Sequence, residues 1–391
     1  MSLGLRRGIA ALAGRALQRA LPRSSKPWGW AIRFEIDAIR DDGEALRFAL
    51  RSLAGLLPHA TASHLAQILA PSRRDPFHPG GSNDMRVQDI ARRPRALGIA
   101  CAVGAVVLGL VYLAMAGAPV RYLVINAGAL ATGVTLLALL GTGRRSGEGW
   151  QVGMIVAAAG ALLATAMFGA TVEGAARWVT LGGGLSVQPS LVLLPAMLLA
   201  FARRRHMLVT AAIIAAAAAL AIQPDRAMAA MLVAGLAVLL AQRPDRHVAI
   251  ALGASAIGLM TTLARADTLP AVPYVDQILY SSFDVHALAG VAVLAGSALL
   301  LLPAIMAGGR DPADRATYAM FSALWLSAIL AAALDNYPTP VVGYGGSAIL
   351  GYLLSLLELP EAAGVRTGAA AGRRADADGM PSDVPLSLRP A

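Results

Sequence analysis

VQPSLVLLPAMLLAFARRRHMLVTAAIIAAAAALAI, residues 187–222, contains two apolar runs on either side of three arginines and a histidine. Each run approaches the roughly 20 apolar residues that cross the hydrocarbon layer of a bilayer. Because backbone amides and carbonyls in lipid must be bonded within their own segment, both runs are expected to be helices. The basic residues at 203–206 then mark the turn and hold it at an aqueous surface.

The rest of the chain has the same character. Of 391 residues, 57% are hydrophobic and only 14% are charged, which fits a polytopic membrane protein better than a soluble domain. The net charge of +10 comes almost wholly from arginine in short loops and in the N-terminal region, where membrane topology explains it without a nucleic-acid partner. The single cysteine, Cys101, excludes an intramolecular disulfide, and the six histidines show no metal-binding spacing.

Ten apolar runs predict ten transmembrane helices and an all-α polytopic fold. They lie at about 97–116, 122–140, 150–170, 187–202, 206–222, 227–241, 247–264, 285–307, 316–334 and 343–359. The even-numbered gaps between them carry nine arginines against four in the odd-numbered gaps. The positive-inside rule therefore places both termini in the cytoplasm of a multi-pass membrane protein.

Two polar regions flank the predicted membrane domain of 96–360. Residues 1–95 begin with a basic segment, which reads equally well as an amphipathic helix on the inner leaflet or as a frayed basic tail. Residues 30–57 have the periodicity of a helical hairpin with a turn at 41–43, and 71–84 have the composition of a linker. Residues 361–391 have the composition of a disordered cytoplasmic tail.

The gaps on the non-cytoplasmic side hold the unusual sequences. They contain GAARWVTLGGGLSVQPS (174–190), QPDRAMA (223–229), VDQILYSSFDVHALAG (275–290) and PVVGYGGSA (340–348). Irregular backbone at membrane depth normally lines protein or a wet cavity, and ionisable groups there are functional candidates.

These four blocks, in this order, resemble signatures of the SEDS family (shape, elongation, division and sporulation; the RodA and FtsW group). The first resembles the family's G-A-x-R-W…Q-P-S-E, and the second its Q-P-D-L-G-T-A. The third resembles T-D-F-I-F…E-E-x-G-x-x-G, and the fourth P-x-x-S-Y-G-G-S-S. The ten-span count agrees as well, so the resemblance covers roughly 96–360.

The resemblance implies a peptidoglycan glycosyltransferase of the bacterial inner membrane that uses the undecaprenyl-linked precursor lipid II. It implies a penicillin-binding transpeptidase, or another protein of the cell-shape or division machinery, as partner. Asp276 matches the family's presumed catalytic carboxylate, which would accept a proton from the acceptor sugar hydroxyl. The leaving diphosphate needs positive charge, for which Arg177 is a candidate, or a divalent cation. The remaining substrate-binding candidates from the matching blocks are Trp178, Gln188, Ser190, Asp284, Tyr344 and Ser347.

Several positions depart from the family pattern. Leu191 and Leu194 replace a glutamate and a lysine, and the gap before the eighth span is only about 20 residues. Two leucines in place of a buried ion pair can be neutral for stability while catalysis is lost. A catalytically degenerate scaffold that binds a cell-wall or division partner is therefore the alternative function. A precursor transporter ranks third, because paired intramembrane charges are lacking.

Each candidate also has a plain structural interpretation. Asp276 would be an exposed loop carboxylate that caps the eighth span, and Asp284 would cap a helix that begins at residue 285. Arg177 and Trp178 would anchor the chain at the interface. Gln188 and its neighbours would open a helix, with polar side chains on its free amides. Residues 343–346 would allow close helix packing.

Overall fold

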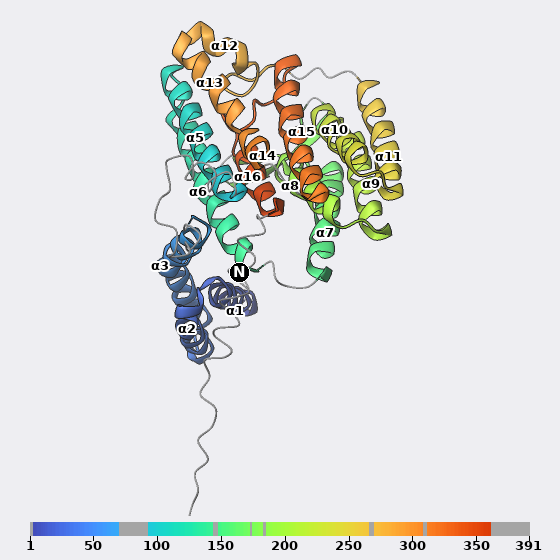
Figure 1. The fold of residues 1–391 in the computed structure, drawn as a ribbon. Coiled ribbons are helices and arrows are strands. Elements are labelled where there is room, and N and C mark those ends of the chain that lie inside the picture. Colours follow the sequence, from blue (N-terminus) through green and yellow to red (C-terminus); the bar gives the residue numbers. More distant parts are fainter. Residues whose placement is uncertain are drawn as a thin grey trace, which may run out of the picture.

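The computed structural model describes residues 3–69, 93–143, 148–172, 174–182, 185–265, 270–307 and 311–360 (Figure 1). Helices lie at all ten predicted span positions. They are α5 (Pro94–Met115), α6 (Val120–Gly143), α7 (Glu148–Phe168), α8 (Pro189–Arg203), α9 (Met207–Ile222), α10 (Arg226–Gln242), α11 (Arg246–Leu263), α13 (Ala287–Leu299) with α14 (Leu302–Ala307), α15 (Pro312–Leu334), and α16 (Gly346–Ser355) with the 3-10 turn η3 (Leu356–Glu358). The all-α polytopic membrane fold is thus confirmed. The predicted linker at 71–84 and tail at 361–391 lie outside the described residues.

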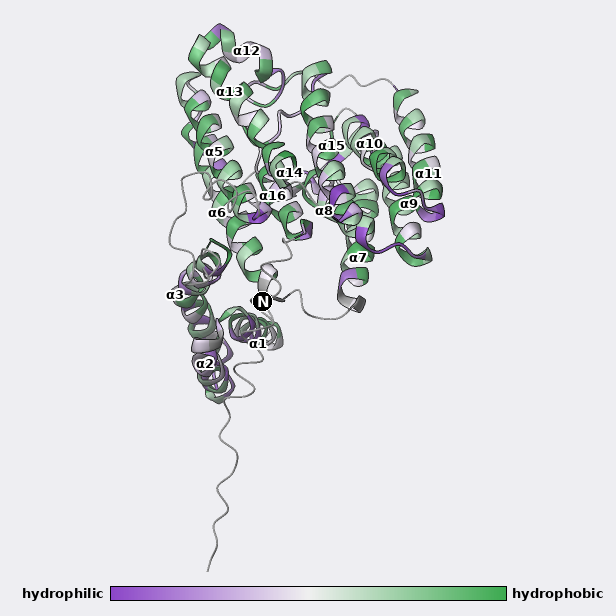
Figure 2. Ribbon diagram, in the orientation of Figure 1, coloured by the Kyte–Doolittle hydropathy of each residue, from purple (hydrophilic) through white to green (hydrophobic). Residues whose placement is uncertain are grey.

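The helices differ in length. Five of those described, α5, α6, α7, α11 and α15, are long and apolar enough to cross a bilayer, and five more apolar helices are shorter, at 10–17 residues. The eighth predicted span is interrupted at Leu300 and Leu301, before Pro303. Proline at this place fits the first turn of α14, where its missing amide hydrogen costs no bond. Figure 2 shows the ten positions as largely hydrophobic ribbons, with hydrophilic segments near their ends.

The helix ends form two faces. The basic face carries Arg203, Arg205 and the start of α11, where Arg205 lies 3.8 Å from Asp245. The side chain of Arg95, at the start of α5, donates to Leu357 O (2.9 Å) and so joins the two ends of the membrane domain on this face. The opposite ends, with the connections at 169–188, 223–225, 264–277 and 335–345, form what we call the loop face.

Three further helices lie beyond the basic face: α1 (Leu3–Ala20), α2 (Lys26–Ala38) after the short turn η1 (Arg23–Ser25), and α3 (Asp42–Leu69) (Figure 1). The predicted hairpin forms as α2 and α3, and the Asp41 carboxylate accepts from Glu44 N (2.7 Å) at its turn. The N-terminal segment is a helix that packs on α3 and α2 through Ala10, Leu17 and Leu21. It is therefore not a frayed tail.

A small sheet corrects the all-α expectation at one place. Strands β1 (Ala170–Val172), β2 (Ala175–Leu181) and β3 (Leu185–Val187) form an antiparallel sheet in the order β1-β2-β3. Val179, Thr180 and Leu181 pair with Val187, Ser186 and Leu185. The β-branched and aromatic residues of β2 favour a strand. The sequence analysis treated this stretch as an irregular turn.

The tightest described helix contact joins α8 and α16 behind the loop face. A Cβ atom added to Gly351 would lie 1.9 Å from Leu191 O, so only glycine allows this backbone approach. Leu191 and Leu194 are buried in the core that the two helices share. This contact fixes the start of α8 against the middle of α16.

We expect Gly351→Ala to destabilise the fold by about 1–3 kcal/mol, because the methyl group would force α8 and α16 apart. Gly160→Ala in α7 is the matched control, since nothing lies within 4 Å of its added Cβ. Thermal unfolding in the same detergent measures both changes. Equal midpoints for the two variants would contradict the proposed close approach.

Candidate functional site

Arg177 is placed by the alternation of strand β2. Ala175 and Arg177 are buried on one side of the strand, whereas Trp178 is half-buried and points to the other side. The Arg177 guanidinium donates to Pro224 O (2.5 Å) and lies 5.7 Å from the centre of the Tyr337 ring. The structure therefore brings Arg177 to the interior of the loop face and leaves Trp178 off it.

A buried carboxylate, Asp225, gathers the polar side chains at the start of α8. Gln188 Nε2 and Ser190 Oγ donate to Asp225 Oδ2, at 2.9 and 3.0 Å. Asp225 Oδ1 caps α10 by accepting from Met228 N (3.2 Å). Asp225 was not among the residues predicted from QPDRAMA, although an acidic residue directly before an apolar run is the usual signal of such a cap.

Gln188 and Ser190 are correctly placed at a helix start, but one part of that interpretation is wrong. Their side chains make no capping bond to α8. Instead, Gln188 N donates to Ser347 Oγ (2.9 Å), at the start of α16. The amide at this helix start is thus satisfied from another helix, because the side chains of Gln188 and Ser190 are used by Asp225.

Asp276 lies in the connection between α11 and the short helix α12 (Ile278–Val285), which the sequence analysis did not predict. Its Oδ2 accepts from Val272 N (2.8 Å), and its Oδ1 has no hydrogen-bond partner among the described residues. The residue is only 8% exposed, so the interpretation as an exposed capping carboxylate is wrong. Burial raises the pKa of Asp276, and the bond from Val272 opposes the shift.

The segment from Tyr337 to Ser347 connects the two carboxylates. Asp276 forms a β-bridge with Pro338, next to the Tyr337 ring that faces Arg177. Further along, Tyr344 N donates to Tyr274 O (2.8 Å), and Ser347 receives the bond from Gln188. This one stretch of chain therefore contains Tyr344 and Ser347 and holds Arg177, Gln188 and Asp276. Gln188 in turn bonds Ser190.

Two residues fix the end of this segment. Asn126 of α6 is fully buried, donates to Gly343 O (2.9 Å) and accepts from Gly345 N (3.1 Å). The Tyr344 ring stacks on Tyr122 with centroids 3.8 Å apart. Burial, with Tyr122 nearby, raises the pKa of Tyr344 and keeps its hydroxyl protonated. Asn126 was missed, since an asparagine inside an apolar run carries no sequence signal for a partner 217 positions away.

Asp284 does not join this group. It is exposed within α12, and the cap of α13 is His286, whose Nδ1 accepts from Leu288 N (3.1 Å). The predicted capping role of Asp284 is therefore wrong, because the helix cap lies two residues later, at His286. The helix begins later than expected because the apolar run from residue 278 forms a separate helix, α12.

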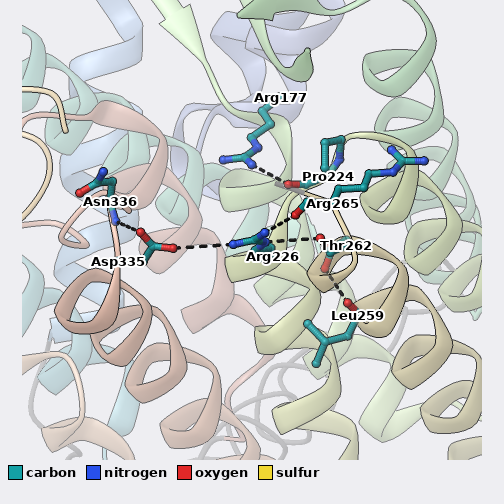
Figure 3. Close-up of polar contacts among 8 residues, drawn as sticks. All are labelled: Arg177, Pro224, Arg226, Leu259, Thr262, Arg265, Asp335 and Asn336. Carbon is teal, nitrogen blue, oxygen red and sulfur yellow. Dashed lines mark hydrogen bonds and ion pairs between the residues drawn. The ribbon is translucent and has the colours of Figure 1, made fainter. Parts of the chain in front are cut away.

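A second cluster of arginines surrounds the start of α10 (Figure 3). Arg226 Nε donates to Thr262 O (3.3 Å), its Nη2 donates to Arg265 O, and its Nη1 lies 4.0 Å from Asp335 Oδ2. Arg226 thus joins the end of α11 to the end of α15. These bonds satisfy carbonyl groups that the end of α11 leaves open.

The described residues contain no group of three or more histidine, cysteine, aspartate or glutamate side chains that could hold a metal ion. Both oxygens of Asp225 already accept hydrogen bonds, from three donors in all, and Asp276 stands on a separate connection. These residues do not fit a resident metal site, and the chemistry below is derived from the chain's own groups.

No family model matches this chain, and no curated protein matches it. Among solved structures, it is similar to the crystal structure of Thermus thermophilus rod shape determining protein RodA, at 23% identity and a TM-score of 0.49, covering 66% of this chain and 93% of that one. An aspartate-to-alanine variant of the same protein matches at 22% identity and a TM-score of 0.48, covering 66% and 94%.

We expect the stability effect of Asp276 to depend on pH. Because burial raises its pKa above that of the unfolded chain, the ionised carboxyl destabilises the fold, and stability returns as pH falls through the folded-state pKa. Asp276→Asn should be more stable than the wild type near pH 8, with a smaller difference near pH 5. Thermal unfolding across this range measures it. A difference that does not vary with pH would contradict the burial of an ionisable group.

We expect Arg226→Ala to destabilise the fold by about 1.5–3 kcal/mol, because it removes charge-assisted bonds to two carbonyl groups. Asp335→Ala should cost less than about 1 kcal/mol, because this carboxylate is half-exposed and its ion pair is long. Thermal unfolding of the two variants compares them. Equal losses would mean that the ion pair, rather than the carbonyl bonds, holds the three helices together.

Proposed function

We propose that this chain is a divergent SEDS-like protein of the bacterial inner membrane that binds a lipid-linked peptidoglycan precursor at its loop face. The observation that carries the proposal is the connection of the four resembling blocks. Arg177 from the first block bonds Pro224 of the second and faces Tyr337, whose neighbour Pro338 bridges Asp276 of the third. The fourth block contacts the first through the hydrogen bond that Gln188 N donates to Ser347 Oγ.

The chemistry follows from Asp276. Its Oδ1, without a partner among the described residues, would accept the proton of an acceptor sugar hydroxyl. That hydroxyl oxygen would form a bond to the donor anomeric carbon as the bond from this carbon to the diphosphate breaks. A raised pKa makes a carboxylate a stronger base, and general bases work best when their pKa lies near the working pH.

The leaving polyprenyl diphosphate needs positive charge at the same face. Arg177, fixed by Pro224 O and close to the Tyr337 ring, supplies a guanidinium on the interior side. Arg226 and Arg265 add two cations at the rim. Fixed charges in a site that excludes water stabilise developing negative charge more strongly than they would in bulk water.

A second function is supported by the packing of α8. Leu191 and Leu194, at the positions of the family's glutamate and lysine, are buried in the core beside the close approach to Gly351. These side chains stabilise the helix contact and offer no polar atom to a substrate. A scaffold that binds the precursor or a cell-wall partner without turnover would keep this packing. The resemblance suggests a penicillin-binding transpeptidase of cell elongation or division as that partner.

Polymerisation of lipid II in proteoliposomes tests the proposed activity. We expect the wild type to form glycan chains and Asp276→Asn to lose about 10²–10⁴-fold in rate, the usual contribution of a general base. Asp314→Asn, at the start of α15 on the basic face, is the matched control and should retain activity. Equal rates for Asp276→Asn and the wild type would exclude Asp276 as the base.

A binding measurement separates the enzyme from the scaffold. We expect Gln188→Ala to weaken lipid II binding, because it releases Asp225 and alters the loop face. A wild type that binds lipid II but does not polymerise it would support the scaffold. A wild type that does neither would contradict both functions.

A further inference from the structure

The helix α2 exposes an aromatic surface outside the membrane domain. Trp28, Trp30 and Phe34 have exposed fractions of 68%, 61% and 81%. The opposite side of the helix, with Gly29 and Ile36, is buried against α1 and α3. Trp30 and Phe34, four residues apart, share one flank of the exposed side of α2, and Trp28 lies on the other flank. Large apolar side chains exposed in this way mark an interaction site.

This surface lies close to the end of a membrane helix. Leu17 and Leu21 of the α1 region pack with Leu139 in the last turns of α6, at the basic face. Gly29 sits against the same part of the chain, because its added Cβ would lie 2.9 Å from Gln18 Cα and 3.2 Å from Leu21 Cδ1. The beginning of α2 therefore packs on the part of α1 that belongs to the same apolar cluster as Leu139 of α6.

Basic residues lie beside the N-terminal part of the aromatic surface, whereas the acidic Glu35 and Asp37 lie beside Phe34. Lys26 Nζ donates to Gln18 O (3.0 Å), and Arg33 Nη1 donates to Gln18 Oε1 (3.3 Å), so both line the seam between α2 and α1. Arg15 and Arg19 are exposed on α1, which has no acidic residue. The acidic residues of α2, Glu35 and Asp37, lie near its far end.

We infer that the module of α1, α2 and α3 docks on the acidic lipid headgroups of the leaflet at the basic face. Trp28 and Trp30 would lie at headgroup level with Phe34 further along the surface, because amphipathic aromatic rings favour the interface. Lys26, Arg15 and Arg19 would add electrostatic attraction, at about fivefold in binding for each charge close to the surface. The inference does not depend on the proposed precursor site.

Charge and position favour lipid over a second copy of the chain. A second copy would bring the same basic α1 face to this surface, and like charges would repel. An acidic bilayer surface is already present at the end of α6 and needs no additional binding partner.

A fluorescent label at residue 34 tests the inference in the full-length protein. Cys101→Ala removes the only cysteine, and Phe34→Cys in this background is labelled with a bimane and reconstituted in vesicles containing brominated phosphatidylglycerol. We expect a blue-shifted emission and strong quenching by the brominated lipid. Glu44→Cys, an exposed position in the first turn of α3, is the matched control and should show neither.

The lipid dependence completes the test. Replacing phosphatidylglycerol with phosphatidylcholine, or introducing Lys26→Gln and Arg15→Gln, should lower the quenching at residue 34, and high salt should do the same. Quenching at 34 no greater than at 44 would overturn the inference. A blue shift without quenching by brominated lipid would also overturn it, since a protein or a second copy would then cover the surface.

Discussion

The loop face depends on how the buried carboxylate of Asp225 is satisfied. Several membrane helices end at this face, and each end leaves backbone groups that its own helix cannot bond. Asp225 accepts from Gln188, Ser190 and Met228 N, so the starts of α8 and α10 are held by one side chain. A buried carboxylate without these donors would be strongly unfavourable, and the loops on this face are therefore closely constrained.

This constraint separates two carboxylates by role. Asp225 accepts hydrogen bonds at both oxygens and serves as a structural centre, whereas Asp276 has one described donor and a raised pKa. The Tyr337–Ser347 segment lies between them and also fixes Arg177 and Tyr344. The arrangement favours a single site on the loop face over four separate connectors.

Much of the architecture could be predicted from the sequence because hydrophobicity and charge determine it directly. Apolar runs located all ten helix positions, and arginines such as Arg203 marked the basic face. The sheet at 170–187 was missed, since its glycines and polar residues resemble a turn when the pairing partner is not visible. Helix α12 was missed because its apolar residues merged with the eighth span.

The site was predictable in part. Arg177, Gln188 and Asp276 were selected from local sequence blocks, and the structure brings them to one segment. Asn126 and the role of Asp225 were not predictable, because both depend on contacts between residues far apart in the chain. Asp284 and Trp178 were selected by position within a block, but neither joins the site. Asp284 lies within α12, before the cap of α13, and Trp178 points to the other side of β2 from Arg177.

The central claim is that the loop face forms one binding site for a lipid-linked diphosphate precursor. Photo-crosslinking with a lipid II analogue that carries a diazirine near the diphosphate, followed by peptide mapping, tests it most directly. The account predicts labelled peptides from both 174–190 and 335–347, with loss of label when unmodified lipid II is added in excess. Labelling confined to the basic face, or labelling that excess lipid II does not reduce, would contradict it.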